Sequence, residues 1–316
     1  MTGALRSVPG AVPADPPDDT VAGHYGDPFR EQRRFVSGEG AVDLSHRPVL
    51  RVSGPDRLTW LHSLTTQHLE HLAPGIAAEA LVLSPHGHVE HALYLVDDGT
   101  ATWMHVEPGT APALIGYLTS MRFWNDVEVE DVSSSYGVVL LPQGRTFAGG
   151  LTRVTPLGTE LLVPRDQLLA TVQAAGDPVG IWASEALRVA MRLPRLGFET
   201  DHRTIPHEVG WLATAVHLDK GCYRGQETVA RVHNLGRPPR RLVLLHLDGS
   251  ESALPGHGDA VELDGRQVGF VGTAARHYEL GPVALALVKR STPEDAALVA
   301  GGVPASQDVV ALGQPS

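Results

Sequence analysis

Apolar and polar positions follow two periods along the first part of the chain. Leu58, Leu61 and Leu64 recur at helical spacing after a turn at residues 53–56, which predicts a helix. Further helices are predicted over residues 112–122, 166–175 and 184–191. Short apolar runs bounded by turn residues predict strands at 49–52, 78–83, 89–96, 102–106, 127–132, 136–141 and 161–164. Strands and helices mix without the long crossovers of a doubly wound sheet, which favours an α+β fold.

The pattern changes after Arg231. Residues 236–241 are rich in Pro and Arg and are typical of a linker. Four short apolar runs follow, at residues 242–247, 260–263, 268–273 and 283–288. Asp264-Gly265 lies between two apolar runs, as in a two-residue hairpin turn. Short strands at this spacing predict a small antiparallel β-barrel over residues 237–316.

Composition narrows the class of protein. A chain of 316 residues with 42% hydrophobic and 19% charged residues predicts a soluble globular protein of two or three lobes. A formal charge of −11 argues against a general nucleic-acid binder, and no apolar run reaches the roughly 18 residues of a membrane span. Residues 1–34 are rich in Pro and Asp and lack a signal-peptide core, which predicts a disordered or extended lead-in and a cytoplasmic protein.

Candidate chemistry concentrates in residues 220–227, Lys-Gly-Cys-Tyr-Arg-Gly-Gln-Glu. Cys222 is the only cysteine, so this chain alone cannot build a disulfide framework or a multi-cysteine cluster site. Gly221 and Gly225 permit positive φ, which predicts a sharp turn around Cys222. A helix is predicted over residues 226–233, and its dipole together with Lys220 would favour an accessible thiolate. The alternative is a buried cysteine that acts as a small apolar residue.

The sixteen histidines include two local groups, residues 86–91 and the pair His68 and His71. One helical turn separates His68 from His71, which is a spacing compatible with a metal. No carboxylate or cysteine stands at a strong metal spacing beside them, so we predict no metal site. The segment at 85–91 is interpreted as a loop beside a pocket.

Motifs for nucleotide and serine-hydrolase chemistry are absent from the sequence. The chain has no Gly-x4-Gly-Lys, no Gly-x-Gly-x-x-Gly after a strand and no Gly-x-Ser-x-Gly. Arg192, Arg195 and Arg203 lie close in sequence to the acidic residues Glu199 and Asp201. They predict either an ion-pair network or a site for an anionic ligand tail, and the sequence leaves both open.

Residues 220–231, Lys-Gly-Cys-Tyr-Arg-Gly-Gln-Glu-Thr-Val-Ala-Arg, resemble the signature of the YgfZ-type folate-binding proteins, which are relatives of the glycine-cleavage T-protein (aminomethyltransferase). The similarity extends over roughly residues 35–290 and includes residues 43–46, 52–56, 83–89, 204–208 and 269–273. It implies an α+β, three-lobed T-protein-like fold around a central ligand opening. Two α/β lobes would occupy residues 35–236, with an inserted lobe near 53–140, and the small C-terminal β-barrel would complete the fold.

The resemblance also implies a function, namely assistance in the assembly or repair of iron–sulfur enzymes. The implied cofactor is tetrahydrofolate or a derivative, and the implied partners are iron–sulfur client or assembly proteins, with no membrane and no direct nucleic acid. It assigns Cys222 and Lys220 to the chemistry. The residues that it assigns to the cofactor are Tyr223, Gly225, Gln226, Glu227, Arg231, Glu208 and His88.

Two positions depart from the T-protein pattern. The catalytic aspartate of the T-protein would fall near His91-Ala92, where no carboxylate is available for proton transfer. The glutamate that grips the pterin ring would fall near Ala190, which weakens the expected folate binding. Two alternatives therefore stay open: a folate-dependent aminomethyl or one-carbon transferase, and a non-catalytic adaptor that has lost folate binding. Whether the protein is an enzyme also stays open.

Overall fold

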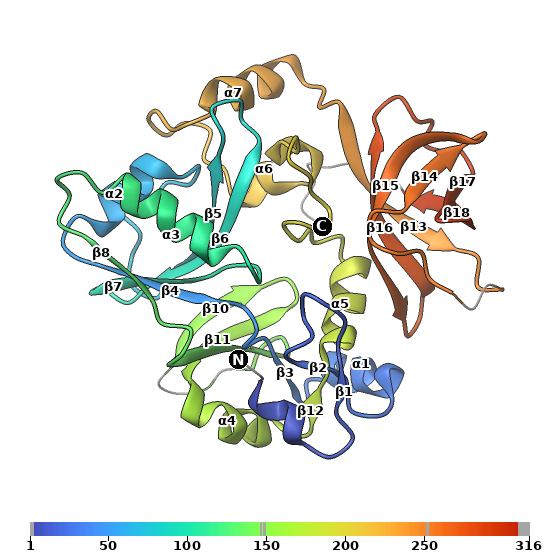
Figure 1. The fold of residues 1–316 in the computed structure, drawn as a ribbon, viewed down its shortest axis with the longest axis horizontal. Helices are drawn as coiled ribbons and strands as arrows, with labels where there is room; N and C mark the ends of the chain where they lie inside the picture. The colour runs from blue at the N-terminus through green and yellow to red at the C-terminus, as the bar shows by residue number, and fades with distance from the viewer. Residues whose placement is uncertain (1–2, 146, 148–149, 251–252, 309–316) are drawn as a thin grey trace. The chain divides into compact units, whose positions relative to one another are not determined.

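The computed structural model describes residues 3–145, 147, 150–250 and 253–308 (Figure 1). The chain forms two compact units, of which the first comprises residues 1–82 and 91–184 and the second comprises residues 83–90 and 185–316. The tip of one β-hairpin, residues 83–90, therefore belongs to the second unit. Within the described ranges, no helix combines the length and the apolar character that a bilayer crossing requires.

Two five-stranded sheets form the frame of the first unit. One has the order β10-β11-β9-β3-β12, with bounds Leu151–Thr155, Gly158–Pro164, Tyr136–Leu141, Ala41–Asp43 and Pro178–Val179. The other has the order β5-β6-β7-β4-β8, with bounds Ala77–Leu83, Val89–Asp97, Ala101–His105, Val49–Ser53 and Glu128–Asp131. The helices that accompany them are α2 (Arg57–Leu64), α3 (Ala111–Ser120), η2 (Arg165–Gln167) and α4 (Leu168–Ala175). Mixed strands and helices confirm the predicted α+β class.

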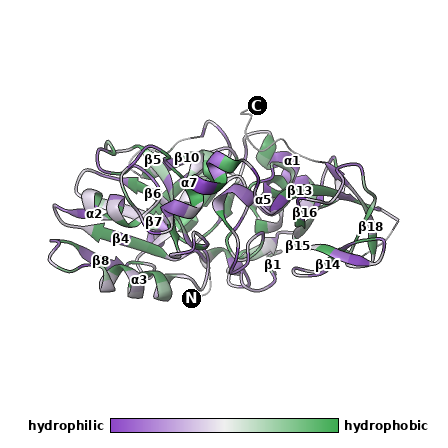
Figure 2. Cartoon of the chain, turned by 90° about the horizontal axis from the view of Figure 1, so that it is seen from above, coloured by the Kyte–Doolittle hydropathy of each residue, from purple (hydrophilic) through white to green (hydrophobic). Residues whose placement is uncertain are grey.

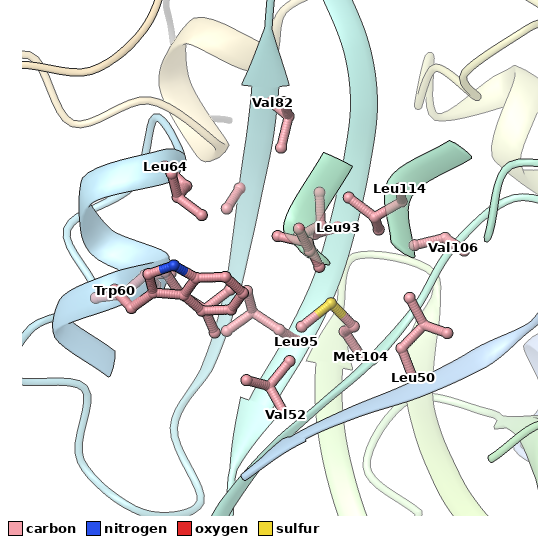
Figure 3. Packing of buried hydrophobic residues seen from close by; sticks show 14 of the residues in the cluster. Leu50, Val52, Trp60, Leu64, Val82, Leu93, Leu95, Met104, Val106 and Leu114 are labelled. Atoms are coloured by element: carbon pink, nitrogen blue, oxygen red, sulfur yellow. The ribbon is translucent and has the colours of Figure 1, made fainter. Parts of the chain in front are cut away.

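An apolar core packs the second of these sheets against α2 and α3. Leu50 on β4 and Met104 on β7 are fully buried, as is Leu114 on α3 (Figure 3). Trp60 on α2 is 3% exposed, and its Nε1 donates to the carbonyl of Met121 over 2.9 Å, so the indole is buried with its polar atom satisfied. Burial of each large side chain contributes about 1.5–3 kcal/mol. Figure 2 shows the apolar colour concentrated on strands such as β4.

The N-terminal segment corrects the prediction of a disordered or extended lead-in. Its described residues form η1 (Ala4–Ser7), the antiparallel pair β1 (Val12–Pro13) and β2 (Ala22–His24), and α1 (Pro28–Val36). Leu5 and Val21 are each 1% exposed, so the segment contributes to the core. Asp27 caps α1, since its Oδ1 accepts from the backbone N–H of Phe29 at 3.1 Å and of Arg30 at 3.0 Å. Asp and Pro therefore serve here as cap and first helical residue rather than as signs of disorder.

A closed barrel in the second unit confirms the predicted C-terminal β-barrel (Figure 1). Its strand order is β13-β16-β15-β14-β17-β18, with bounds Arg240–Leu247, Gly281–Lys289, Arg266–His277, Ala260–Leu263, Leu298–Ala300 and Val303–Asp308. The predicted hairpin at Asp264-Gly265 is confirmed, because both residues have positive φ, 51° and 72°, as a type I′ turn requires. The last two strands are too short and too polar to form apolar runs, so the sequence pattern did not predict them.

A buried ion network joins the two sheets of the first unit. Glu160 on β11 accepts from Arg153 Nε at 2.7 Å and is bonded to His105 Nε2 at 2.8 Å. Arg153 on β10 also donates to Glu79 on β5, over 3.0 Å. Because Arg153 points inward and is only 6% exposed, β10 lacks the apolar pattern of a buried strand. This strand was therefore absent from the predicted elements.

The Glu160 carboxyl group stays ionised in this network although it is buried. Burial acts to raise the pKa of Glu160, but Arg153 and His105 outweigh it and hold that pKa well below the usual range. Burial lowers the pKa of His105. At neutral pH the network is therefore a Glu160 carboxylate paired with the Arg153 cation, with a neutral His105 donating from Nε2.

We predict that Glu160→Gln lowers the free energy of unfolding by about 3 kcal/mol, because it leaves the buried Arg153 guanidinium beside a neutral amide. Urea denaturation measures the loss. The matched control is Glu130→Gln, which breaks a 2.8 Å pair with Arg51 whose side chains are 35% and 37% exposed. That pair is expected to contribute about 0–1 kcal/mol. Equal losses in the two variants would contradict the role of Glu160.

Candidate functional site

Residues 220–225 form a loop that leads into α7 (Gln226–Leu235), so the predicted helix is confirmed. Gly225 immediately precedes the helix and adopts φ 83°. Gly221, in contrast, is not among the described glycines with positive φ. The turn therefore needs the conformational freedom of Gly225 and not that of Gly221, which corrects one half of the prediction.

The start of α7 lies at the tip of the β5–β6 hairpin (Figure 1). Gly225, just before α7, packs backbone against backbone on this tip. A Cβ atom at Gly225 would lie 2.6 Å from the carbonyl oxygen of Ser84 and 2.9 Å from Cα of Gly87. A Cβ atom at Gly87 would lie 2.7 Å from Cβ of Thr228. The two chains can approach this closely only because both positions are glycine. The start of α7 is thereby fixed to the hairpin.

Two further contacts hold the same hairpin. Arg224 Nη1, one residue before Gly225, lies 3.1 Å from Glu90 Oε2 on the hairpin. The backbone N–H of Val89 donates to the carbonyl of Thr204 over 2.8 Å, which ties the hairpin to the segment before η3 (Pro206–Glu208). The segments around 83–90, 204 and 220–228, which are far apart in sequence, are thus side by side within the second unit.

The loop buries two side chains and exposes the thiol between them. Lys220 is 6% exposed and Tyr223 is 8% exposed, and the Lys220 Nζ atom lies 5.1 Å from the centroid of the Tyr223 ring. Burial lowers the pKa of Lys220 to about 8, and it raises the pKa of Tyr223 to about 12. Cys222 is exposed, which answers the alternative of a buried apolar cysteine. The thiol faces solvent from a loop whose neighbouring side chains are anchored.

The other residues assigned to the cofactor lie around this loop. Gln226 is half-buried, and its Nε2 donates to the carbonyl of Lys220 over 3.4 Å. Glu227 and Arg231 are exposed on α7, and His88 is half-buried on the hairpin. The structure brings the hairpin and the start of α7 together, and contact of each of these residues with a cofactor stays a prediction.

Both carboxylate oxygens of Glu208 are hydrogen-bonded within the protein. The residue is fully buried, and its two carboxylate oxygens each accept from Arg240 on β13 at 2.8 Å. Oε2 also accepts from the backbone N–H of Ile205 at 3.1 Å. Arg240 further pairs with Asp201, where burial acts to raise the pKa but Arg240 and neighbouring donors hold it well below the usual range. The arrangement favours a structural role for Glu208, holding η3 to the barrel, over contact with a cofactor.

The arginines near residue 195 form ion pairs, which supports the network alternative of the sequence analysis. Arg195 is 1% exposed and pairs with Glu185 at 3.2 Å, while Arg192 pairs with Asp308. Arg203, the third arginine, is exposed.

Arg188 on α5 (Ile181–Ala190) is the centre of this network, and it was not among the residues predicted from the sequence. It binds Glu185 at 2.8 Å, Glu199 at 3.0 Å and the Thr273 hydroxyl at 2.6 Å. The spacing of Glu185 and Arg188 by three residues on a predicted helix is the sequence signal that indicates their ion pair. On β15, a Cβ atom at Gly272 would lie 2.6 Å from Glu199 Oε1, so the glycine makes room for the carboxylate.

The two positions that depart from the T-protein pattern lie in different units. His91 on β6 is 8% exposed, and burial lowers its pKa to about 4, so its imidazole is neutral at pH 7. Ala92 beside it is 2% exposed. Ala190 ends α5 and is half-buried. None of the three supplies a carboxylate.

Comparison with known proteins identifies the fold to which this architecture is similar. No family model matches the chain. In structure, the chain is similar to the glycine cleavage system aminomethyltransferase T of Bartonella henselae, with a TM-score of 0.83 over 98% of this chain and 96% of that chain, at 16% identity. The chain has a T-protein-like fold. This finding confirms the fold class that the sequence resemblance implied, while the lobe boundaries stay predictions.

Curated relatives support the T-protein-like family. The chain is 28% identical over 277 residues to a chloroplastic protein of Arabidopsis thaliana named as a candidate transferase, and this match covers 74% of the chain but only 61% of that relative. It is 25% identical to an aminomethyltransferase of Herpetosiphon aurantiacus, with coverage of 84% and 82%. It is 28% identical to an aminomethyltransferase of a Nostoc species, with coverage of 82% and 79%. The narrower resemblance to YgfZ-type proteins stays a prediction.

We predict that Gly225→Ala is strongly destabilising and that Gly221→Ala is not. The first adds about 1–2 kcal/mol of left-handed backbone strain and a further ~1–3 kcal/mol of overpacking against Ser84 and Gly87. A Cβ atom at Gly221 has no neighbour within 4 Å and needs no positive φ, so this matched variant should stay close to wild type. Unfolding in urea compares the two, and similar losses would disprove the importance of the glycine contact.

We predict that burial of Lys220 makes stability rise with pH between about 8 and 10.5. The folded-state pKa of about 8 lies below the ordinary value of 10.5, so in this window the unfolded chain holds a proton that the folded chain has lost. Lys220→Met should therefore be most stabilising, relative to wild type, at pH 8 and below, and this advantage should shrink as pH approaches 10.5. Urea midpoints across this range measure it, with Lys289→Met at an exposed lysine as control. A difference that does not change with pH would refute the effect.

Proposed function

We propose that the protein assists the assembly or repair of iron–sulfur enzymes, using the loop at residues 220–227 and a folate-type ligand. The observation that carries this proposal is the exposed Cys222 in a loop anchored by Lys220 and Tyr223, next to the glycine contact that fixes α7. An anchored surface loop of this kind suits a thiol that contacts a partner protein. Its neighbours keep their positions while the thiol remains accessible.

The chemistry of the thiol supports transient binding of iron or transient reaction with a partner's sulfur. Thiolate is a soft ligand for iron and a nucleophile toward a partner's sulfur. One cysteine cannot hold a cluster alone, so a cluster would be shared with a client protein or with an exogenous ligand. Lys220, with a pKa near 8, is mostly protonated at pH 7 and adds positive charge to the loop.

Tetrahydrofolate or a derivative is the proposed ligand of the same region. The relatives named aminomethyltransferase and the T-protein-like fold support a folate-type ligand. The Gln226 amide, the Glu227 carboxylate and the His88 imidazole are groups that hydrogen-bond a pterin ring, and Arg231 is an exposed cation suited to an anionic tail. The fit is partial, because Ala190 has no carboxylate and Glu208 is occupied by Arg240. When bound, the folate would supply a one-carbon carrier.

Aminomethyl transfer is the second candidate function, and the names of the relatives favour it. It requires a group that takes part in proton transfer or stabilises a developing cation. His91 is neutral at pH 7 and Ala92 has no functional group, so neither replaces the T-protein aspartate. This is the reason for placing the accessory role first. The adaptor without folate remains the alternative if no folate binds.

We predict that Cys222→Ser abolishes the function in cells while the protein still folds. In a strain that lacks the native gene, the activities of several iron–sulfur enzymes under oxidative stress should fall to the level without the protein. Gly221→Ala is the matched control, since it alters the neighbouring residue but keeps the thiol, and it should restore wild-type activities. Equal protein levels are checked in all strains.

Calorimetry with tetrahydrofolate completes this test on the purified full chain. Saturable binding is expected for the wild type and for Cys222→Ser alike, because the thiol is not assigned a folate contact. Full enzyme activities with Cys222→Ser would show that the thiol role is wrong. An absence of binding at millimolar ligand would remove folate from the proposal and leave the adaptor.

A further inference from the structure

Three side chains with metal-ligating atoms meet where α2 ends. His62 lies in the last turn of the helix, and His68 and Glu70 follow in the next turns of the chain. One ligand atom from each of the three lies within 4.8 Å of the other two. The rings of His62 and His68 have centroids 4.8 Å apart and are nearly perpendicular, at 86°. The sequence showed only the spacing of His68 and His71, and the fold adds His62 and a carboxylate.

We propose that His62, His68 and Glu70 form a binding site for a divalent first-row transition-metal ion, with Zn²⁺ as the reference ion. Two imidazoles and one carboxylate are a ligand set that holds zinc while leaving one position open. Bonds of about 2.0–2.2 Å to a tetrahedral ion place the ligand atoms roughly 3.4 Å apart. The side chains must therefore close by about 1.4 Å from the 4.8 Å limit. Glu70 is exposed and both histidines are half-buried, and the proposal requires their side chains to rotate by this amount.

The backbone that carries these side chains is anchored. Leu69, between His68 and Glu70, is fully buried in the apolar core of the first unit. The backbone N–H of Thr66 donates to the carbonyl of Leu81 over 3.0 Å, and that of Leu72 donates to the carbonyl of Leu69 over 3.0 Å. The ligands therefore project from a fixed turn, which limits the ordering that metal binding must impose.

The hydrogen bond that His62 accepts must change when the metal binds. The backbone N–H of Leu69 donates to His62 Nδ1 over 3.3 Å, which places the ring proton of neutral His62 on Nε2. A metal at Nε2 moves that proton to Nδ1, opposite the Leu69 N–H, so the ring turns and gives up this long bond. The Leu69 amide therefore reports on occupancy of the site.

The surroundings favour a cation at this place. His62 lies in the last turn of an eight-residue helix, where the aligned peptide dipoles give the helix end a partial negative charge. His71 is exposed, and its ring centroid lies 5.9 Å from that of His68, so a further imidazole lies near the three proposed ligands. The site lies in the first unit and does not involve residues 220–227, so it stands independently of the proposed function.

The test uses the full chain, purified without a polyhistidine tag and stripped of metal with a chelator. Calorimetry with Zn²⁺ and visible absorption with Co²⁺ should both give one ion per chain. Glu70→Gln and His68→Asn should each weaken binding by ~10-fold or more, a loss at least as large as that from altering an outer-shell partner. The amide signal of Leu69 should shift with Zn²⁺ in the wild type.

His86→Gln is the matched control, since His86 is an exposed histidine whose ring lies 6.2 Å from that of His88. Its metal affinity should equal that of the wild type. The proposal fails if the wild type binds neither ion, if Glu70→Gln binds as tightly as the wild type, or if His86→Gln weakens binding equally. Glu70 is exposed, so its substitution decides the matter even if His68→Asn perturbs the fold.

Discussion

Backbone touches backbone where Gly87 meets Gly225, and the candidate site depends on this contact. With no side chain between them, the hairpin tip and the start of α7 are held at van der Waals distance. Arg224 and Glu90 add an ion pair at the same junction, with side chains 33% and 38% exposed. The loop before α7 therefore ends at a fixed point, and Cys222 is exposed between the buried Lys220 and Tyr223. Shape, rather than charge, positions the thiol.

Charge has the complementary role of joining elements inside each unit. Glu160 links strands of two sheets in the first unit, while Glu199 and Glu208 connect loops to helix α5 and to the barrel in the second. A buried carboxylate is tolerated only with its partners in place, since desolvation is otherwise prohibitive. Acidic and basic residues that resemble a ligand site in the sequence can therefore be fully used by the fold.

Local chemistry explains what the sequence could predict. Asp264-Gly265, the helix after Gly225 and the four apolar runs of the barrel follow from turn and pattern rules that act over a few residues, and the structure confirms them. The same rules do not predict the strand that carries Arg153, because its inward side chain is paired with residues from other strands. Glu208 and the group formed by His62, His68 and Glu70 likewise depend on tertiary neighbours, which no local pattern contains. Exposure of Cys222 needed the structure for the same reason.

A chain with one cysteine, exposed on an anchored loop, has a simple stoichiometry of oxidation. Two molecules can join through Cys222, and the resulting covalent pair has no thiol left with which to grow. An oxidant that takes up the two electrons and two protons of a pair of Cys222 thiols therefore links two copies of this chain and no more. For the same reason, a thiol-directed fluorophore attaches at a single known point, and its signal reports on the surroundings of this loop alone.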